Sequence, residues 1–177
     1  LLALFNREIL QTTEGTKASA ELEIRYTLGG EEAVAKRTIS MDVLYRNAIS
    51  WDDDRKAASF VTAKDPAILA FAKEIAGSVR ERDASGFILQ FRQALAIQEA
   101  LSIYGMNYVV DPKSSYAELS ASDASLDYMQ FPGQSLTYRA GDCDDLTVLY
   151  CALLEAAGIE TAFVTVPGHI YAAFSPG

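Results

Sequence analysis

Clusters of lysine and arginine are absent from this sequence, which has 24 acidic against 15 basic residues and a formal net charge of −9. Binding of nucleic-acid phosphates needs concentrated positive charge, so we expect no nucleic-acid partner. The sequence also lacks an apolar run of the ~20 residues that a membrane span requires, and we expect no such span. No internal repeat or low-complexity tract occurs, which argues against a solenoid.

Cysteine and histidine are equally scarce, because Cys143, Cys151 and His169 are the only residues of these two types. The cysteines lie on one predicted helix, separated by ~12 Å along its axis, so they cannot form a disulfide with each other there. Zinc accepts such ligands together with an aspartate, but the short Cys-x2–4-Cys pair of zinc sites is missing. We therefore expect no metal and no cofactor.

What the sequence does contain is enough apolar material for an ordered core, since half of its 177 residues are hydrophobic. This length allows one main domain with an extension. We predict an α+β fold, with a β-rich extension over residues 1–64 and a core over residues 65–177 in which helices pack on a small antiparallel sheet.

The predicted extension contains a β-hairpin. Residues 20–26 and 33–39 alternate apolar and charged side chains and are joined through Gly29 and Gly30, which predicts two paired strands with one solvated face.

Three consecutive aspartates, Asp52, Asp53 and Asp54, raise the possibility of a calcium site. Adjacent side chains cannot converge on one centre, however, and the glycine and distal glutamate of an EF-hand loop are missing. We interpret these residues as helix-capping.

Helices and a loop follow. Asp65 and Pro66 are a typical N-cap and first residue, and they predict a helix whose apolar stripe precedes Gly77. A second helix is predicted from about Phe87 to Tyr104, closed by Gly105. Residues 107–128 are polar and predict a long loop that either covers a site or stays mobile.

Cys143 stands at the start of a third predicted helix, within Gly141-Asp142-Cys143-Asp144-Asp145, and this helix ends at Gly158. First-turn N–H groups and the helix dipole favour a thiolate and lower a cysteine pKa. The neighbouring aspartates oppose this effect if their carboxylates point at the sulfur. Their orientation therefore decides the sign of the pKa shift.

His169 follows on the second of two predicted strands, residues 159–166 and 169–174, which are joined by Pro167 and Gly168. A cysteine at a helix start and a histidine on a following strand can meet across the core. Such a pair is what general-base activation of a thiol requires.

The sequence around these two residues resembles the transglutaminase-like superfamily, in particular its bacterial cysteine-peptidase branch. The matching residues are 139–146, 153–159 and 166–169, within a stretch that spans residues 131–174. The resemblance implies a papain-like core in which Cys143 attacks a glutamine amide or peptide carbonyl of a protein or peptide substrate. His169 moves the proton, and the thioester passes to an amine or to water.

The resemblance also implies a third residue, usually an acid, that orients the histidine from the next strand. This chain ends at Gly177 and begins without an initiator methionine or the layout of a signal peptide. We expect an excised fragment, truncated at its C-terminus, whose third triad residue lies outside the chain and which is inactive or lacks the strand bearing the acid. Members of the family are often extracytoplasmic, which favours a periplasmic or extracellular setting.

An oxyanion hole is expected from the backbone N–H of Cys143 and one donor upstream of it. Gln134 is the first candidate, because a side-chain amide before the nucleophile plays this part in papain-like enzymes, and Tyr138 is the alternative. A simpler role for Gln134 is to satisfy a turn.

Two functions are thus predicted. The first is cysteine-dependent acyl transfer or amide hydrolysis by Cys143 and His169. The alternative is a catalytically inactive transglutaminase-like module for protein–protein interaction, in which the hairpin edge accepts a partner strand.

Overall fold

The chain divides into two compact units, Leu1–Ala48 and Ile49–Gly177. The computed structural model describes residues 6–81, 88–110 and 126–176. The sequence placed the division after residue 64, whereas here it falls earlier. The reason is that Ile49, Trp51 and Phe60 are buried in one hydrophobic cluster with residues of the second unit.

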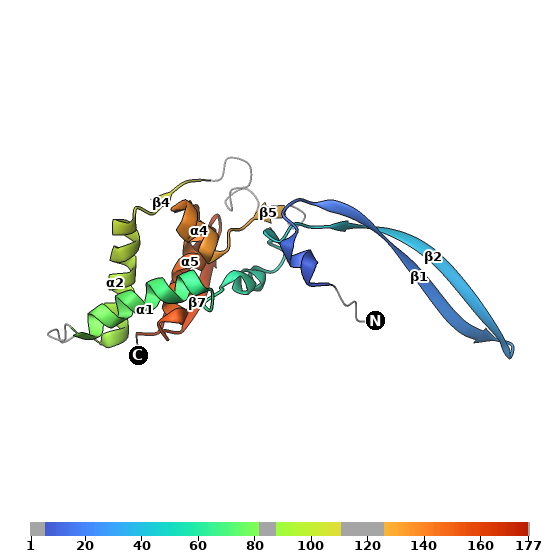
Figure 1. Ribbon diagram of the computed structural model, residues 1–177, viewed down its shortest axis with the longest axis horizontal. Helices are drawn as coiled ribbons and strands as arrows, with labels where there is room; N and C mark the ends of the chain where they lie inside the picture. The colour runs from blue at the N-terminus through green and yellow to red at the C-terminus, as the bar shows by residue number, and fades with distance from the viewer. Residues whose placement is uncertain (1–5, 82–87, 111–125, 177) are drawn as a thin grey trace. The chain divides into compact units, whose positions relative to one another are not determined.

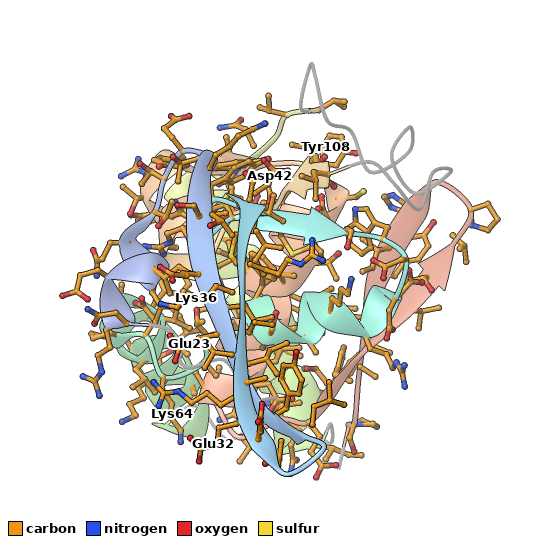
Figure 2. All side chains as sticks on the ribbon, turned by 90° about the vertical axis from the view of Figure 1, so that its right-hand side faces the viewer. Glu23, Glu32, Lys36, Asp42, Lys64 and Tyr108 are labelled. Carbon is orange, nitrogen blue, oxygen red and sulfur yellow. The ribbon has the colours of Figure 1, made fainter. Side chains whose placement is uncertain are left out.

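The first unit consists of a short 3-10 helix, η1 (Arg7–Gln11), and a long hairpin of β1 (Thr16–Leu28) and β2 (Glu31–Val43) (Figure 1). The strands pair in antiparallel register, with Ala20 opposite Ile39, so the predicted hairpin is confirmed and its strands are longer than expected. On its charged face, Lys36 lies opposite Glu23 and forms an ion pair with it at 3.1 Å; both are labelled in Figure 2.

The other face of the hairpin is mostly apolar, with Arg37 and Glu31 among its residues, and it is also exposed, so the prediction of one solvated face is incomplete. Directly opposed residues share a face of an antiparallel pair. The large side chains on this face are mostly exposed, from Met41 at 38% to Leu28 at 71%; they are Ile24, Tyr26, Leu28, Ile39 and Met41. Two strands alone have no second layer with which to cover a face.

In its described residues, the second unit combines helices with three two-stranded sheets, which confirms the α+β class at this level. The helical elements are η2 (Asp54–Phe60), α1 (Pro66–Glu81), α2 (Leu89–Tyr104), α4 (Pro132–Tyr138) and α5 (Cys143–Ala156). The strands are β3 (Ala48–Ser50), β4 (Asn107–Tyr108), β5 (Leu126–Tyr128), β6 (Ala140–Gly141), β7 (Thr161–Val166) and β8 (His169–Phe174). Strand β3 pairs with β5, β4 with β6 in parallel, and β7 with β8 in antiparallel register.

The helix boundaries largely follow the sequence signals. Asp65 caps α1, because its Oδ1 accepts a hydrogen bond of 2.9 Å from the Ala67 N–H. The helix then runs through Gly77 to Glu81, further than predicted. Gly105 follows the last residue of α2, and Gly158 comes shortly after the end of α5. Both have a positive φ, a left-handed conformation that glycine adopts without strain because it has no side chain.

The predicted loop over residues 107–128 has short strands at its two ends, β4 and β5. Residues 111–125, between those strands, lie outside the described part of the chain. None of the helices in the described ranges is long and apolar enough to cross a membrane.

Helix α5 lies at the centre of the core and contributes to both of its hydrophobic clusters. Its fully buried side chains pack against α1, α2 and α4 on one side and against β8 on the other; they include Val148, Leu149, Ala152, Leu153 and Leu154. A helix that is apolar on nearly all sides is stable only when it is surrounded in this way.

The three aspartates of residues 52–54 lie at the start of η2. Asp53 caps this helix through the Arg55 N–H and binds the Arg55 guanidinium through both carboxylate oxygens. Asp52 accepts hydrogen bonds from Ser50 and Lys56. The capping role predicted for this run is therefore confirmed at Asp53.

Candidate functional site

Cys143 is the first residue of α5, where the chain passes from β6 into the helix. Gly141 makes this passage possible, because a Cβ at that position would lie 2.6 Å from the Asp145 Cβ. Such a distance is well inside van der Waals contact, so any side chain at residue 141 would push β6 away from the first turn of α5. The Gly-Asp-Cys sequence is thus a packing requirement as well as a turn.

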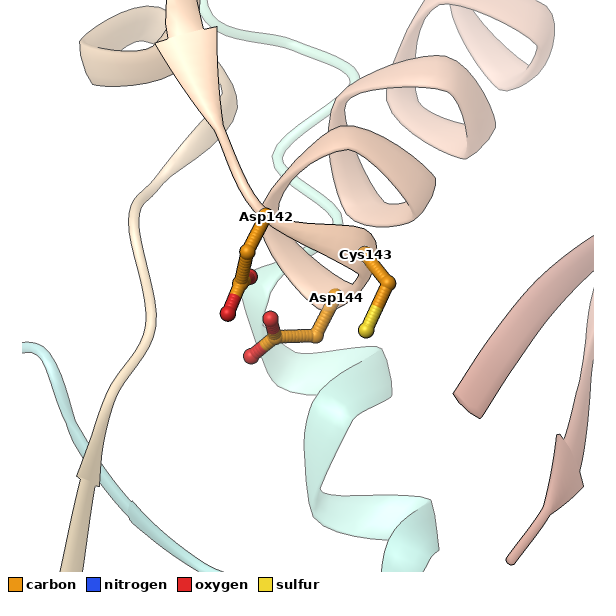
Figure 3. A group of neighbouring side chains, drawn as sticks. All are labelled: Asp142, Cys143 and Asp144. Carbon is orange, nitrogen blue, oxygen red and sulfur yellow. The ribbon is translucent and has the colours of Figure 1, made fainter. Parts of the chain in front are cut away.

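The aspartates around Cys143 are buried. Figure 3 shows the carboxyl groups of Asp142 and Asp144 turned toward one another, with the sulfur of Cys143 projecting from the same turn. Burial raises the pKa of Asp144 far above the usual range. A hydrogen bond with Asp142 and the charge of Asp142 add to this effect. Asp144 therefore keeps its proton at neutral pH.

Asp145 points to the other side of the turn. Its two carboxylate oxygens accept hydrogen bonds from the backbone N–H and the side-chain amide of Gln130, at 2.7 and 2.6 Å. Burial nevertheless raises the pKa of Asp145 to about 7, because two donors only partly replace the lost water. Asp145 thereby ties the segment before α4 to the first turn of α5.

Cys143 is 8% exposed, and its environment decides the sign of the pKa shift that the sequence left open. Burial raises the pKa of Cys143 to about 11, and the charges of Asp142 and Asp144 add to this effect. Hydrogen bonds from the backbone of Ile170 and Asp144 work in the opposite direction. Desolvation and the two nearby carboxyl groups therefore outweigh the lowering effect of the helix start, and the pKa shift is upward.

Strand β8 reaches α5 through the backbone of Ile170. Val166 and His169 close the two-residue turn of the hairpin, so the next pair, Thr165 and Ile170, directs its N–H and C=O groups away from the partner strand. Accordingly, the Ile170 C=O accepts a hydrogen bond of 3.2 Å from the Thr147 hydroxyl, and its N–H points to the sulfur of Cys143. These contacts fix the start of β8, and with it His169, beside the first two turns of α5.

Cys143 and His169 line one cavity of about 320 Å³. The sequence predicted that these residues would meet, and they do share this space. The remaining lining is largely aromatic and apolar; it comprises Gln98, Tyr108, Leu146, Thr147, Tyr150, Ile170, Tyr171 and Ala172. The Tyr171 ring packs edge-on against the His169 imidazole, with 4.4 Å between ring centroids, and restricts its orientation.

Tyr108 is the residue of this cavity that the sequence did not reveal. It is hydrogen-bonded to the Cys143 side chain, and burial together with the charge of Cys143 raises the pKa of the Tyr108 phenol. Its backbone is fixed by the parallel β4–β6 bridge, in which Tyr108 lies opposite Gly141 and the Val109 N–H donates to the Gly141 C=O at 2.9 Å. No local pattern marks Tyr108, because its role depends on this long-range pairing.

The ends of the two segments that form this bridge are also held together. Arg139 has a left-handed backbone (φ 56°), and its guanidinium lies 4.4 Å from the centroid of the Tyr104 ring. Stacking of this kind stabilises by about 0.5–1 kcal/mol at exposed sites. This stacking offsets part of the backbone strain at Arg139 and holds the start of β6, which leads into α5.

The two oxyanion candidates from the sequence lie on α4. The Gln134 side-chain oxygen accepts a hydrogen bond of 2.9 Å from the Phe131 N–H, and so completes the first turn of its own helix. Tyr138 is largely exposed. Neither residue lines the cavity of Cys143 and His169, and their part in an oxyanion hole stays a prediction.

Possible metal ligands within the described ranges gather at the same turn. One donor atom each of Asp142, Cys143 and Asp144 lies within 4.8 Å of the others. The Oδ1 atom of Asp144 is buried and has no hydrogen-bond partner among the described residues. Cys151, part of the zinc set considered from the sequence, is a free, buried thiol two turns further along α5.

No protein-family model matches this chain, and no match was found among curated proteins. Among solved structures, the crystal structure of a "putative protease" from Parabacteroides distasonis is similar, with 14% sequence identity and a TM-score of 0.38. The alignment covers 85% of this chain and 31% of that one, so this chain spans about a third of its length.

Proposed function

We propose that this chain carries a transglutaminase-like active site that performs cysteine-dependent acyl transfer or amide hydrolysis. The observation that supports the proposal is the shared cavity, in which the thiol of Cys143 at a helix start and the imidazole of His169 on β8 face the same space. The two come from separate elements held together by Ile170 and Thr147. A thiol and an imidazole that face one cavity are the residue types that a nucleophile and its general base require.

The raised pKa of Cys143 decides how the nucleophile forms. With a pKa of about 11, the thiol is protonated at neutral pH, so His169 removes the proton as the sulfur attacks. The S–C bond forms, the carbonyl oxygen becomes an oxyanion, and collapse expels the amine, which takes the proton from His169. Water or a second amine, deprotonated by His169, then attacks the thioester and regenerates the thiol.

Tyr108 supplies the second oxyanion donor in this scheme, beside the Cys143 N–H. Its side chain is already hydrogen-bonded to the sulfur, so the phenol lies near the carbon that the sulfur attacks. The raised pKa of Tyr108 keeps the phenol protonated and therefore able to donate. Donors placed where negative charge develops are among the largest contributions to such reactions.

The lining of the cavity favours an extended protein or peptide substrate with an apolar or aromatic group beside the reacting carbonyl. Tyr150 and Tyr171 present ring surface, and Leu146 and Ala172 add aliphatic surface. Among the described residues, His169 is the one basic side chain that lines the cavity. A strongly acidic substrate would therefore meet no opposite charge there.

Acylation of the chain by p-nitrophenyl acetate tests the proposal. We expect a burst of one p-nitrophenolate per chain that Cys143→Ala abolishes and that His169→Gln slows by about 10²-fold. Cys151→Ala is the matched control, because it removes the other buried thiol of α5, whose pKa is also raised to about 11. A burst that survives in Cys143→Ala would refute the proposed nucleophile.

The role of Tyr108 is tested in the same assay. Tyr108→Phe should slow acylation by about 10²-fold, the usual cost of losing one oxyanion donor. Alkylation by iodoacetamide, which forms no oxyanion, should change little once the rates are normalised to each variant's thiolate fraction. Tyr104→Phe removes a hydroxyl outside the cavity and should leave acylation unchanged.

A second candidate is a binding module without catalysis, and the hairpin of the first unit favours it. Its exposed apolar face carries Ile24, Tyr26 and Leu28 along one strand. Exposed patches of this kind often mark interaction sites. The absence of any Cys143-dependent burst would favour this candidate over the enzyme.

A further inference from the structure

A second cavity, of about 630 Å³, runs along the free edge of β7 and shares no residue with the cavity of Cys143. Strand β7 forms one side of this groove, and η2 with the segment after it forms the other. The lining residues are Asp54, Arg55, Ala58, Val61, Ala63, Glu155, Thr161, Ala162, Phe163 and Thr165. Because Ala57 and Phe60 anchor η2 in the core, both sides of the groove are fixed.

The backbone of β7 presents unused hydrogen-bonding groups to this groove. Strand β8 covers only one edge, and the register directs the N–H and C=O groups of Thr161, Phe163 and Thr165 to the other. The Thr161 N–H is taken by the Glu155 carboxylate at 2.8 Å, which confirms that this set of residues faces outward. Within the described part of the chain, no hydrogen bond engages the outward N–H groups of Phe163 and Thr165.

The charge of the groove favours a basic occupant. Arg55 is bound through both carboxylate oxygens of Asp53, so its charge is largely balanced. Asp54 and Glu155 then leave the lining acidic, on a chain whose net charge is −9. A second copy of this chain pairing β7 with β7 would bring these carboxylates together, and like charges disfavour that dimer.

We propose that the β7 groove binds an extended, basic segment of another polypeptide by strand addition. The segment pairs its backbone with Phe163 and Thr165, rests an apolar side chain on Val61 and Ala58, and places a lysine or arginine near Asp54 and Glu155. An unpaired strand edge gives affinity through main-chain hydrogen bonds, and side-chain contacts then give specificity. This site is independent of the proposed reaction at Cys143.

Three acetylated heptapeptides of alternating threonine and valine, with lysine, glutamate or proline at the centre, probe the groove. We expect the lysine peptide to shift the amide resonances of Phe163 and Thr165 and to slow their hydrogen exchange. It should bind at least ~10-fold more tightly than the glutamate peptide, a difference typical of one charged contact. The proline peptide, which lacks a central N–H and breaks strand pairing, should bind more weakly still.

Variants of the groove sharpen the test. Thr165→Pro removes an outward N–H, a change that an edge strand tolerates, and should weaken lysine-peptide binding ~10-fold, whereas Thr165→Val keeps the N–H and should not. Asp54→Lys should reverse the preference between the lysine and glutamate peptides. If Thr165→Pro does not fold, the comparison of the three peptides still decides.

Several results would overturn the proposal. The first is the absence of any amide shift at Phe163 and Thr165 with the lysine peptide. The second is equal binding of the lysine and proline peptides. The third is protection of these two amides without peptide, together with concentration-dependent dimerisation, because that result would make a second copy the occupant.

Discussion

The two halves of α5 differ sharply in what they bury. The second half packs Leu149, Leu153 and Leu154 among apolar side chains of the surrounding helices. The first turn and its N-cap bury a thiol and three carboxyl groups, and the pKa of one of these groups, Asp144, is raised far above its usual range. Burying apolar surface stabilises the fold, whereas burying ionisable groups costs free energy. The second half therefore anchors the helix and allows its first turn to hold groups that chemistry needs.

The largest expected effect concerns the anchoring half. Leu153→Ala removes a fully buried side chain and should lower the unfolding free energy by about 2–5 kcal/mol, the usual cost of a cavity in a core. Chemical denaturation followed by circular dichroism measures this loss. Leu95→Ala, at a largely exposed position on α2, is the control and should stay within about 0.5 kcal/mol. Equal losses in the two variants would contradict the division proposed for α5.

A smaller effect is expected at Gly141, where β6 meets the first turn. Gly141→Ala places a Cβ 2.6 Å from the Asp145 Cβ, and the overpacking should cost about 1–3 kcal/mol. Thermal unfolding measures it. Gly77→Ala is the matched control: nothing lies within 4 Å of its new Cβ, and a glycine-to-alanine change inside a helix should stabilise the fold slightly. A neutral Gly141→Ala would mean that the first turn is loosely packed.

The smallest effect, counted per pH unit, is a pH dependence that belongs to the first turn. The folded pKa of Asp145, about 7, lies above the ordinary value of 3.8 for an aspartate. The native state therefore holds an extra proton between about pH 4 and 7, and the unfolding free energy falls as the pH rises through this window. Each such carboxyl contributes up to about 1.4 kcal/mol per pH unit, and Asp144 adds to the same trend.

Denaturant titrations at several pH values test this dependence. Asp145→Asn should reduce the slope between pH 4 and 7. Asp53→Asn should leave it unchanged, because the pKa of Asp53 is lowered to about 2 by Arg55 and its effect lies below pH 4. A slope that survives Asp145→Asn unaltered would assign the titration to other groups.

Much of the fold was visible in the sequence because its signals are local. Period-two alternation located β1 and β2, Asp65 and Pro66 located the start of α1, and Gly105 located the end of α2. The apolar stripe of α1 was predicted to precede Gly77, but the helix continues to Glu81, because a single glycine with open space around it does not end a helix. The boundary between the units was placed too late, because burial of Trp51 and Phe60 is a tertiary property that no local pattern reports.

The candidate site was predictable where it rests on chain order and hidden where it rests on pairing across the fold. The motif around Cys143 and the turn before His169 brought attention to two residues that line one cavity. Tyr108 was not predicted as a site residue, because only the pairing of β4 with β6 brings it to the thiol. The sign of the Cys143 pKa shift could not be predicted either, because it depends on burial and on where Asp142 and Asp144 point.

The raised pKa of Cys143 has a consequence for the durability of the protein in an oxidising setting. The thiolate is the form that attacks peroxides and disulfides, and a pKa of about 11 in place of 9.0 leaves about 10²-fold less thiolate at neutral pH. The folded chain thus keeps its sulfur in the form that resists sulfenic acid formation. Unfolding removes this protection, so oxidative damage at Cys143 should accumulate first in chains that have lost their native packing.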